Sequence, residues 1–478
     1  MMIDINRLID VACNEYSGFA ARYTGDEMAT HILRSLLAAA SFAALAACGH
    51  DASDMPGGQP LADARSYDNP AWPAAAIADP ARLGFTAEGL QALDARMKQA
   101  VDSKEIAGIS YALVKDGEVA AFKAVGSQIL GGAPMTDDTL FRVRSTGKTI
   151  TAVAMMQLWE QGKWKPEDPI TKFIPEFASL KVATSTDNLS NLAPVSHIPT
   201  MHEVMTHTAG FSYGLRTDIA ADRAYRDADV LRAKDMKTFV DEVARLPLAN
   251  QPGERWYYSV TYDLQGAIIE RITGKTLGAY LEENLFKPMA MNDTGFWLTE
   301  ADRPRLVTVH TRNATTGVLE VMKDEDNFIS EDPFKRNSHF ESGGGGASGL
   351  LSTLHDMVRF TQMLTNKGEL GGKRILKPET VDFMMQNHIG AMRGVLGGPG
   401  YGFGYGGRVV VDGSTETTPQ PNGAFSHFSI DGCWFWVDPA NKLSFVGLIA
   451  RRGGGPAGGV VMGGEGDAPR LVYRALAK

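Results

Sequence analysis

The stretch Phe141-Arg142-Val143-Arg144-Ser145-Thr146-Gly147-Lys148-Thr149-Ile150-Thr151 opens a segment that runs on to Gly162. Apolar residues recur along it at helical spacing and a glycine closes it, which predicts a helix. Ser145 and Lys148 are three residues apart, so both would lie on one helix face. The first turn of a helix also presents unpaired N–H groups and the positive end of the dipole. The pattern fits a nucleophilic serine, but taken alone it is more typical of a capping serine followed by a solvated lysine.

The composition is that of a folded protein with an acidic surface. The 478 residues are 44% hydrophobic and 22% charged, which allows one large composite fold or two domains. A net charge of -9 weighs against a nucleic-acid partner. Three widely spaced cysteines, Cys13, Cys48 and Cys433, suggest neither a disulfide framework nor a zinc site. We therefore expect no metal and no cofactor.

The N-terminal region predicts an export signal. From Met28 the chain carries a basic residue, an apolar run and Leu45-Ala46-Ala47-Cys48, which resembles the lipobox of bacterial lipoproteins. We expect translation to start at Met28, residues 1–48 to be an extension plus signal, and residues 49–80 to be a tether. This predicts a periplasmic lipoprotein of the bacterial cell envelope, anchored to the membrane through lipidated Cys48. A cytoplasmic protein is the alternative if the signal is not used.

The remaining chain shows strand patterns near both ends and helical patterns between them. Ile109–Val114 and Val119–Val125 flank an Asp-Gly pair, a strong hairpin signal. Further strands are expected at 408–411, 434–437 and 443–450. Helices are expected at 86–101, 200–208, 235–246, 260–273, 276–286, 353–366, 377–387 and 468–478. We therefore predict an α/β domain from residues 81–160 and 340–478, with a mainly helical domain, 161–339, inserted in it.

Four segments in this order resemble the serine β-lactamase and penicillin-binding protein superfamily, in particular its class C-like branch and the family VIII carboxylesterases. The resemblance covers roughly residues 85 to 478. The segments are Phe141–Val153, Thr206-His207-Thr208-Ala209-Gly210-Phe211, Gln251-Pro252-Gly253 with Trp256-Tyr257-Tyr258-Ser259, and Gly345–Thr353. It implies a β-lactamase-like fold, with an antiparallel sheet flanked by helices.

The resemblance also implies roles for individual residues. Ser145 would be the nucleophile, Lys148 the adjacent base and Tyr258 the second acid/base group, with Tyr257 as the alternative tyrosine. Which of Lys148 and Tyr258 removes the serine proton stays open. The backbone N–H groups of Ser145 and Ile430 would form the oxyanion hole.

The sequence departs from the family at its third motif. β-Lactamases carry Lys-Thr/Ser-Gly there and family VIII esterases commonly carry Trp-Gly-Gly, whereas this chain has His427-Phe428-Ser429. A mostly neutral histidine is a poor partner for a substrate carboxylate, which favours esters that lack one. His427 can equally be a hydrogen-bonded core residue. We predict a substrate-binding set made of His427, Phe428, Ser429, Trp256 and Tyr213.

Three other patterns have simpler interpretations. Gly210-Phe211-Ser212-Tyr213-Gly214 matches G-x-S-x-G but follows a capped helix instead of a strand, so Ser212 is expected in a loop. His202 and His207 are five apart, which is not the spacing of a zinc-binding helix. Gly402–Gly407 lacks the context of a dinucleotide site and is expected to be a tight loop.

The leading hypothesis is a carboxylesterase that cleaves small or aromatic esters through an acyl-Ser145 intermediate. The alternatives on the same site are a β-lactamase or D,D-peptidase, and an amide hydrolase or acyltransferase. The non-enzyme alternative is an envelope lipoprotein that keeps the fold as a binding module. The expected partner is a small-molecule ester, and the oligomeric state does not follow from the sequence.

Overall fold

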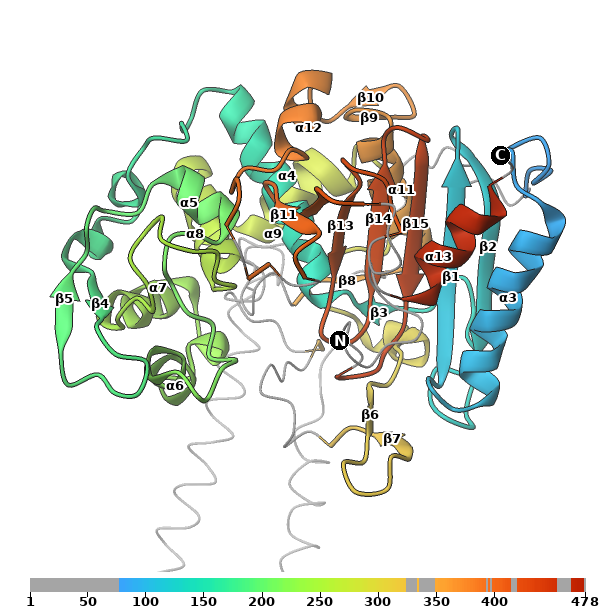
Figure 1. The fold of residues 1–478 in the computed structure, drawn as a ribbon, viewed down its shortest axis with the longest axis horizontal. Helices are drawn as coiled ribbons and strands as arrows, with labels where there is room; N and C mark the ends of the chain where they lie inside the picture. The colour runs from blue at the N-terminus through green and yellow to red at the C-terminus, as the bar shows by residue number, and fades with distance from the viewer. Residues whose placement is uncertain are drawn as a thin grey trace, which may run out of the picture. The chain divides into compact units, whose positions relative to one another are not determined.

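Seven antiparallel strands form one sheet in the order β11-β12-β13-β14-β15-β1-β2 (Figure 1). Their bounds are β11 Tyr401–Phe403, β12 Arg408–Val410, β13 Phe425–Phe428, β14 Trp434–Asp438, β15 Leu443–Leu448, β1 Gly108–Lys115 and β2 Glu118–Gly126. The two chain ends meet where β1 pairs with β15, with Ser110 opposite Leu448. This arrangement confirms the predicted α/β, β-lactamase-like fold class with an antiparallel sheet.

The structure is a computed structural model that describes residues 77–323, 333–334, 349–392, 394–395, 398–413, 419–453 and 466–476. All of them belong to the compact unit Pro56–Lys478. The predicted signal, the lipobox at Cys48, most of the tether and the glycine run of the fourth motif lie outside the described residues.

The predicted hairpin is present between β1 and β2. Its turn consists of Asp116 and Gly117, which have φ values of 53° and 80°. Positive φ at both central residues is the type I′ pattern, whose twist matches that of the flanking strands. The Asp-Gly pair thus sets the pairing next to the turn, Lys115 with Glu118 and Val114 with Val119, before the register shifts between Leu113 and Val114.

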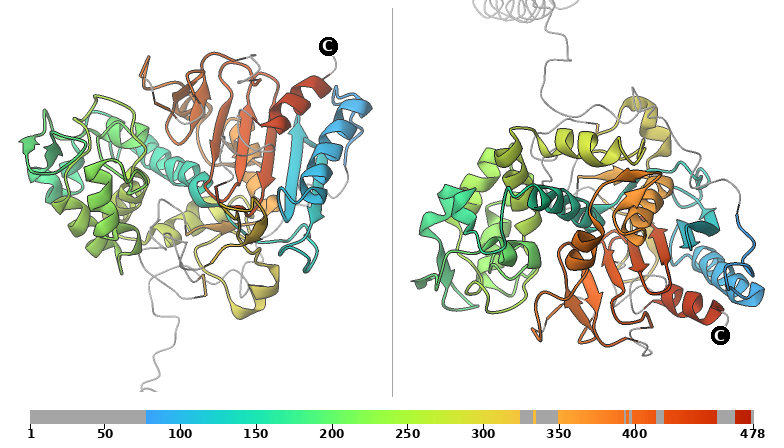
Figure 2. Two further views of the ribbon diagram at one scale, coloured as in Figure 1. Left: turned by 60° about the horizontal axis from the view of Figure 1, so that its bottom comes forward. Right: turned by 90° about the horizontal axis from the view of Figure 1, so that it is seen from above.

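The two faces of the sheet are covered by different helices, because side chains alternate along each strand. On one face, Tyr111, Trp436 and Phe445 pack in a cluster with residues of α3 (Ala87–Asp102) and α13 (Asp467–Ala475). On the opposite face, Phe435 and Val446 join the main core. Figures 1 and 2 show α3 and α13 side by side against the sheet.

The main core lies between the sheet and the remaining helices. It includes residues of α4 (Gly147–Glu160) and α11 (Leu354–Thr365), and α11 contacts β1, β14 and β15. The turn between β11 and β12 packs closely on α4, because a side chain at Gly406 (φ 104°) would approach Ala152 Cβ to 2.6 Å. The segment Gly402–Gly407 was predicted as a tight loop. Its first two residues belong to the edge strand β11, and the rest forms the turn to β12.

The middle of the chain supplies mostly helices. They are α5 Met201–Thr206, α6 Ala220–Asp227, α7 Met236–Arg245, α8 Thr261–Thr273, α9 Leu277–Leu281 and, later, α12 Pro378–Met384. The predicted capping box at the start of α5 is present, with Thr200 and Glu203 bonded reciprocally. Short strand pairs that the sequence analysis did not predict also occur, namely β4 Lys181–Ala183 with β5 Leu192–Pro194, and β6 His310–Arg312 with β7 Leu319–Val321. In addition, β3 Phe141–Arg142 pairs with β8 Leu351–Ser352, and β9 Glu369–Leu370 with β10 Lys373–Arg374.

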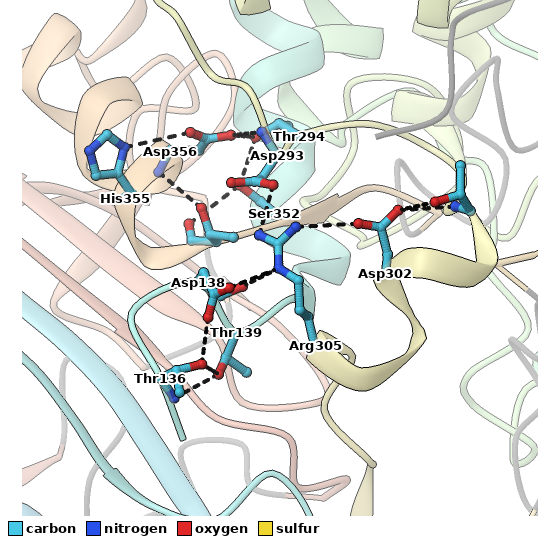
Figure 3. A network of polar contacts seen from close by, with 12 residues as sticks. Thr136, Asp138, Thr139, Asp293, Thr294, Asp302, Arg305, Ser352, His355 and Asp356 are labelled. Atoms are coloured by element: carbon cyan, nitrogen blue, oxygen red, sulfur yellow. Dashed lines mark hydrogen bonds and ion pairs between the residues drawn. The ribbon is translucent and has the colours of Figure 1, made fainter. Parts of the chain in front are cut away.

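A polar network joins segments that are distant in sequence (Figure 3). Arg305 makes ion pairs with Asp138 (3.2 Å), Asp293 (2.7 Å) and Asp302 (3.3 Å). Burial and the neighbouring Asp356 raise the pKa of Asp293, while Arg305 opposes them. The network connects the segment before β3 to the segment before α11, so it stabilises the approach to the Ser145 turn.

Candidate active site

Ser145 lies in a tight turn that precedes α4. Residues Arg144–Thr146 form a 3₁₀ turn and the α-helix starts at Gly147, so the predicted helix begins later than the sequence pattern indicates. Thr146 Oγ1 donates to the Val143 carbonyl at 2.7 Å, a side-chain bond that secures this turn. Ser145 is 9% exposed, which leaves its side chain reachable at the edge of the core.

Two side chains donate hydrogen bonds to Ser145 Oγ. The Tyr258 hydroxyl donates at 2.8 Å and Lys148 Nζ donates at 3.2 Å. Lys148 lies on the first turn of α4 and is fully buried. Tyr258 comes from the segment just before α8, more than a hundred residues away. The structure thus brings together the three residues predicted as the catalytic set.

Aromatic rings surround the Lys148 ammonium. Its Nζ lies 5.0 Å from the ring centroid of Tyr258 and 5.1 Å from that of Tyr213, and donates to the Tyr213 hydroxyl at 3.5 Å. An ammonium over an aromatic face gains about 0.5–2 kcal/mol, depending on how well water is excluded. Tyr213, predicted only as a lining residue, is therefore a direct contact of Lys148.

Asp222 holds both the Tyr213 loop and Tyr257, and the sequence analysis did not find it. Its carboxylate accepts from the backbone N–H groups of Gly214 (2.7 Å) and Leu215 (3.0 Å) and from the Tyr257 hydroxyl. Tyr257 consequently faces away from the nucleophile and Tyr258 faces it. An acidic residue in an ordinary helical pattern gives no sequence signal for this role.

His207 packs behind Tyr258, with ring centroids 4.7 Å apart. Its Nδ1 accepts from the Ser259 N–H at 3.2 Å, so in the neutral ring the proton is on Nε2. Burial, followed by the charge of Lys148, lowers the pKa of His207 well below its usual value. His207 therefore acts here as a neutral residue that positions the Tyr258 segment.

His427 lies on β13, on the same strand face as Phe425, which belongs to the main core beside α4. Its Nδ1 is 2.9 Å from the Phe428 carbonyl, which can only accept, so Nδ1 carries the proton. Nε2 is then a lone-pair acceptor, and it is buried with no hydrogen-bond partner among the residues that the structure describes. Burial and the nearby Lys148 charge lower the pKa of His427 to about 3. At neutral pH this position presents an uncharged acceptor.

The other predicted substrate-binding residues have different surroundings. Phe428 lies on the opposite strand face, packs with the α3/α13 cluster, and has Arg408 Cζ 4.5 Å above its ring. Ser429 closes the β13–β14 turn, where its Oγ accepts from the Cys433 N–H at 3.0 Å. Trp256 packs on Phe403 at 5.4 Å between ring centroids, next to Tyr258. Of the five predicted residues, Tyr213 and Trp256 contact Lys148 or Tyr258 directly, and His427 is near enough to Lys148 for that charge to lower its pKa.

Ile430 follows in the turn between β13 and β14. Ser429 and Gly432 on either side of it make the bonds of this turn, Ser429 N–H to Cys433 O and Gly432 N–H to Ser429 O. Within the described residues, the Ile430 N–H has no protein acceptor. β13 contacts the Ser145 turn, so this N–H lies in the turn that directly follows the strand next to the nucleophile.

The residues of the remaining patterns lie elsewhere or have structural partners. Ser212 is fully buried in a loop, as predicted, and its carbonyl accepts from Val260 N–H. His202 Nδ1 bonds to the Tyr405 hydroxyl at 2.9 Å. Among the described residues no group of three or more His, Cys, Asp or Glu side chains could hold a metal ion. In the same part of the chain no helix has the length and apolar character needed to span a membrane.

Comparison with known proteins assigns the family. A model of the β-lactamase family matches residues 93–460. The chain belongs to the β-lactamase family. Esterase EstB of Burkholderia gladioli is 30% identical over 388 residues, covering 78% of this chain and 93% of EstB. Lovastatin esterase of Penicillium rubens is 29% identical over 398 residues, which cover 75% of this chain and 92% of the lovastatin esterase.

Solved structures agree with the fold. The structure of EstCE1, described as a hydrolase with promiscuous acyltransferase activity, superposes with a TM-score of 0.67 at 23% sequence identity. It covers 82% of this chain and 98% of EstCE1. At this identity the likeness concerns the fold alone. The family predicted from the four motifs is confirmed by these matches.

Proposed function

We propose that this protein is a serine hydrolase that cleaves small or aromatic carboxylic esters, with Ser145 as the nucleophile. The observation that carries the proposal is the pair of hydrogen bonds to Ser145 Oγ, from the Tyr258 hydroxyl at 2.8 Å and Lys148 Nζ at 3.2 Å. The β-lactamase family assignment and the esterases among its relatives support it.

The chemistry divides into acylation and deacylation. Acylation requires that the Lys148/Tyr258 pair has first lost one proton. Ser145 Oγ then attacks the ester carbonyl carbon, its proton passes to the deprotonated member of the pair, and the carbonyl electron pair moves onto oxygen. The N–H groups of Ser145 and Ile430 stabilise that oxyanion. Collapse of the intermediate expels the alcohol, which takes up the proton. In deacylation, water repeats the sequence on the acyl-Ser145 ester and releases the carboxylic acid.

The uncharged His427 supports esters as the substrate class. A β-lactam or a D-alanyl peptide carries a carboxylate, which is best held by a fixed cation. A histidine whose pKa is about 3 supplies no positive charge at neutral pH, and its Nε2 offers a lone pair instead. A carboxylate beside this nitrogen would meet an acceptor, so uncharged esters fit the site better.

Kinetics with p-nitrophenyl esters test the proposal. The wild-type protein should hydrolyse p-nitrophenyl butyrate, and Ser145→Ala should lose this activity. Ser212→Ala is the matched control, because Ser212 is also a buried serine of a motif-like sequence but lies in a loop. Full activity in Ser145→Ala would contradict the proposal. Turnover of nitrocefin at a higher kcat/KM than any ester would instead favour a β-lactamase or D,D-peptidase.

We further propose that the protein is a periplasmic lipoprotein, attached to the membrane through Cys48. The proposal rests on the Leu45-Ala46-Ala47-Cys48 sequence, which lies outside the described residues. Mass spectrometry of the mature protein should find a lipidated Cys48 as the first residue. An unprocessed N-terminus upstream of Cys48 would contradict it.

A further inference from the structure

A buried ion pair joins the two sides of the predicted oxyanion hole. Arg144 immediately precedes Ser145, and Asp431 immediately follows Ile430. Arg144 Nε donates to Asp431 Oδ2 at 2.7 Å, and the two side chains are 0% and 1% exposed. One contact thus connects the residue before the nucleophile to the residue after the second predicted oxyanion donor.

Arg452 completes the cluster from the segment after β15. Its Nε pairs with the other carboxylate oxygen of Asp431, and the Arg451 N–H donates to the Asp431 carbonyl at 2.8 Å. Burial alone would raise the pKa of Asp431, but Arg144 and Arg452 together lower it below its usual range. Two guanidinium groups therefore contact one ionised carboxylate in the β13–β14 turn.

The backbone of Arg144 adopts an unusual conformation. Its φ is 51°, in the left-handed region that glycine adopts easily and arginine rarely adopts. A residue keeps such a conformation only where its surroundings enforce it, and such positions concentrate at functional sites. The Asp431 carboxylate, which also pairs with Arg452, is one contact that holds the Arg144 side chain. The turn that presents Ser145 is therefore tied to the turn that presents Ile430.

We propose that Arg144 and Asp431 are positioning residues for the oxyanion hole, holding the Ser145 turn and the Ile430 N–H in register. The inference rests on the proposed ester hydrolysis. Neither residue exchanges a proton in the reaction; the pair sets where the two N–H donors stand when the carbonyl oxygen becomes an oxyanion. Donors aimed at a developing charge act only if they are held in place beforehand.

Two substitutions separate this role from simple folding. Asp431→Asn keeps the side-chain shape but removes the charge that holds both arginines. Arg144→Gly removes the guanidinium but retains the backbone conformation, because glycine adopts a positive φ without strain. The matched control is Arg96→Leu, which breaks the ion pairs of Arg96 with Glu105 (2.8 Å) and Asp467 (2.7 Å) on the α3/α13 side of the sheet.

The assay compares kcat and KM for p-nitrophenyl butyrate with the affinity for a phenylboronic acid, which forms a tetrahedral adduct on the serine. Losing one oxyanion donor costs about 100- to 1,000-fold in kcat, so a displaced donor should cost about tenfold or more. We expect both variants to lose kcat and boronic acid affinity by similar factors, with KM changed by less than about threefold, since only the transition state uses the hole. Arg96→Leu should lower Tm with kcat nearly unchanged.

Wild-type kcat and boronic acid affinity in Asp431→Asn and Arg144→Gly would overturn the inference, as would losses that simply follow Tm in all three variants. Absence of ester hydrolysis and of boronic acid binding in the wild-type protein would overturn the proposed function and this inference with it. An active wild type with unaffected variants overturns the inference alone.

Discussion

Replacing His427 with lysine should make the site accept carboxylate-bearing substrates. The neutral histidine offers Nε2 as a buried acceptor, whereas a lysine at the same strand position carries a cation. Because the pKa of His427 is about 3, only about one molecule in ten thousand has this ring charged at pH 7. The wild-type site therefore gains almost nothing from His427 when a carboxylate is present.

The size of the gain follows from two opposing effects. A hydrogen bond to a charged group contributes about 1.5–3 kcal/mol, which corresponds to about 10- to 150-fold in affinity. Against it stand the burial of position 427 and the charge of Lys148, which together lower the pKa of His427 and would also disfavour a second ammonium. We expect a gain near the lower limit, about tenfold in kcat/KM.

The assay uses two esters with the same leaving group, the p-nitrophenyl monoester of succinic acid and its methyl ester. Their kcat/KM ratio within each variant cancels any general loss of activity. Nitrocefin provides a second test. Its carboxylate lies on the leaving-group side of the reacting carbonyl, whereas that of the succinate ester lies on the acyl side. His427→Gln is the control, because it removes the imidazole without adding charge.

The reasoning would be refuted by either of two results. One is a wild-type protein that prefers the carboxylate ester over its methyl ester. The other is the same ratio in His427→Lys and His427→Gln for both substrate types. In either case, residue 427 would not determine whether the site prefers a neutral or a negatively charged substrate.

Further predictions concern the tyrosines, acid stability and a helix cap. Tyr258→Phe should lower kcat by about 100-fold or more, because it removes a proton-transfer group. Tyr257→Phe should mainly lower Tm, because it removes the bond to Asp222. Equal kcat losses of the two variants in p-nitrophenyl butyrate assays would contradict this. The pKa values of His207 and His427 are lowered on folding, so the unfolded chain binds more protons and stability should fall as pH drops from about 6.5 towards 3. Urea titrations across this range should show a weaker acid dependence in His427→Gln. Thr200→Ala should reduce the free energy of unfolding by about 0.5–2 kcal/mol, because it removes the α5 capping box; an unchanged urea midpoint would show that the cap contributes nothing.

Local patterns were enough for much of the fold. The Asp116-Gly117 turn, the Thr200 cap and the apolar strands near both chain ends can be predicted because each depends on residues within a few positions of one another. The spacing of Ser145 and Lys148 is also a local feature. Short strands such as β4 and β6 were missed, since two or three residues carry too little pattern to recognise.

The site depended on contacts between distant segments. The sequence could name Tyr258 through a motif, yet its position 2.8 Å from Ser145 Oγ depends on how the segment before α8 packs against the α4 turn. The motif alignment preferred Tyr258 over Tyr257, and the structure adds the reason: Tyr257 bonds to Asp222, whose bonds have no sequence signature.

By itself the sequence determined the nucleophile motif, the family and the missing cation at position 427, because these are properties of residue type and short spacing. The tertiary structure decided the tautomer of His427, through the Phe428 carbonyl, and the pairing of Arg144 with Asp431. The His427 bond is local but depends on how the strand folds, whereas the Arg144–Asp431 pair joins residues 287 apart in the sequence. Burial gives a charge or a lone pair its energetic weight, and burial is a property of the folded chain.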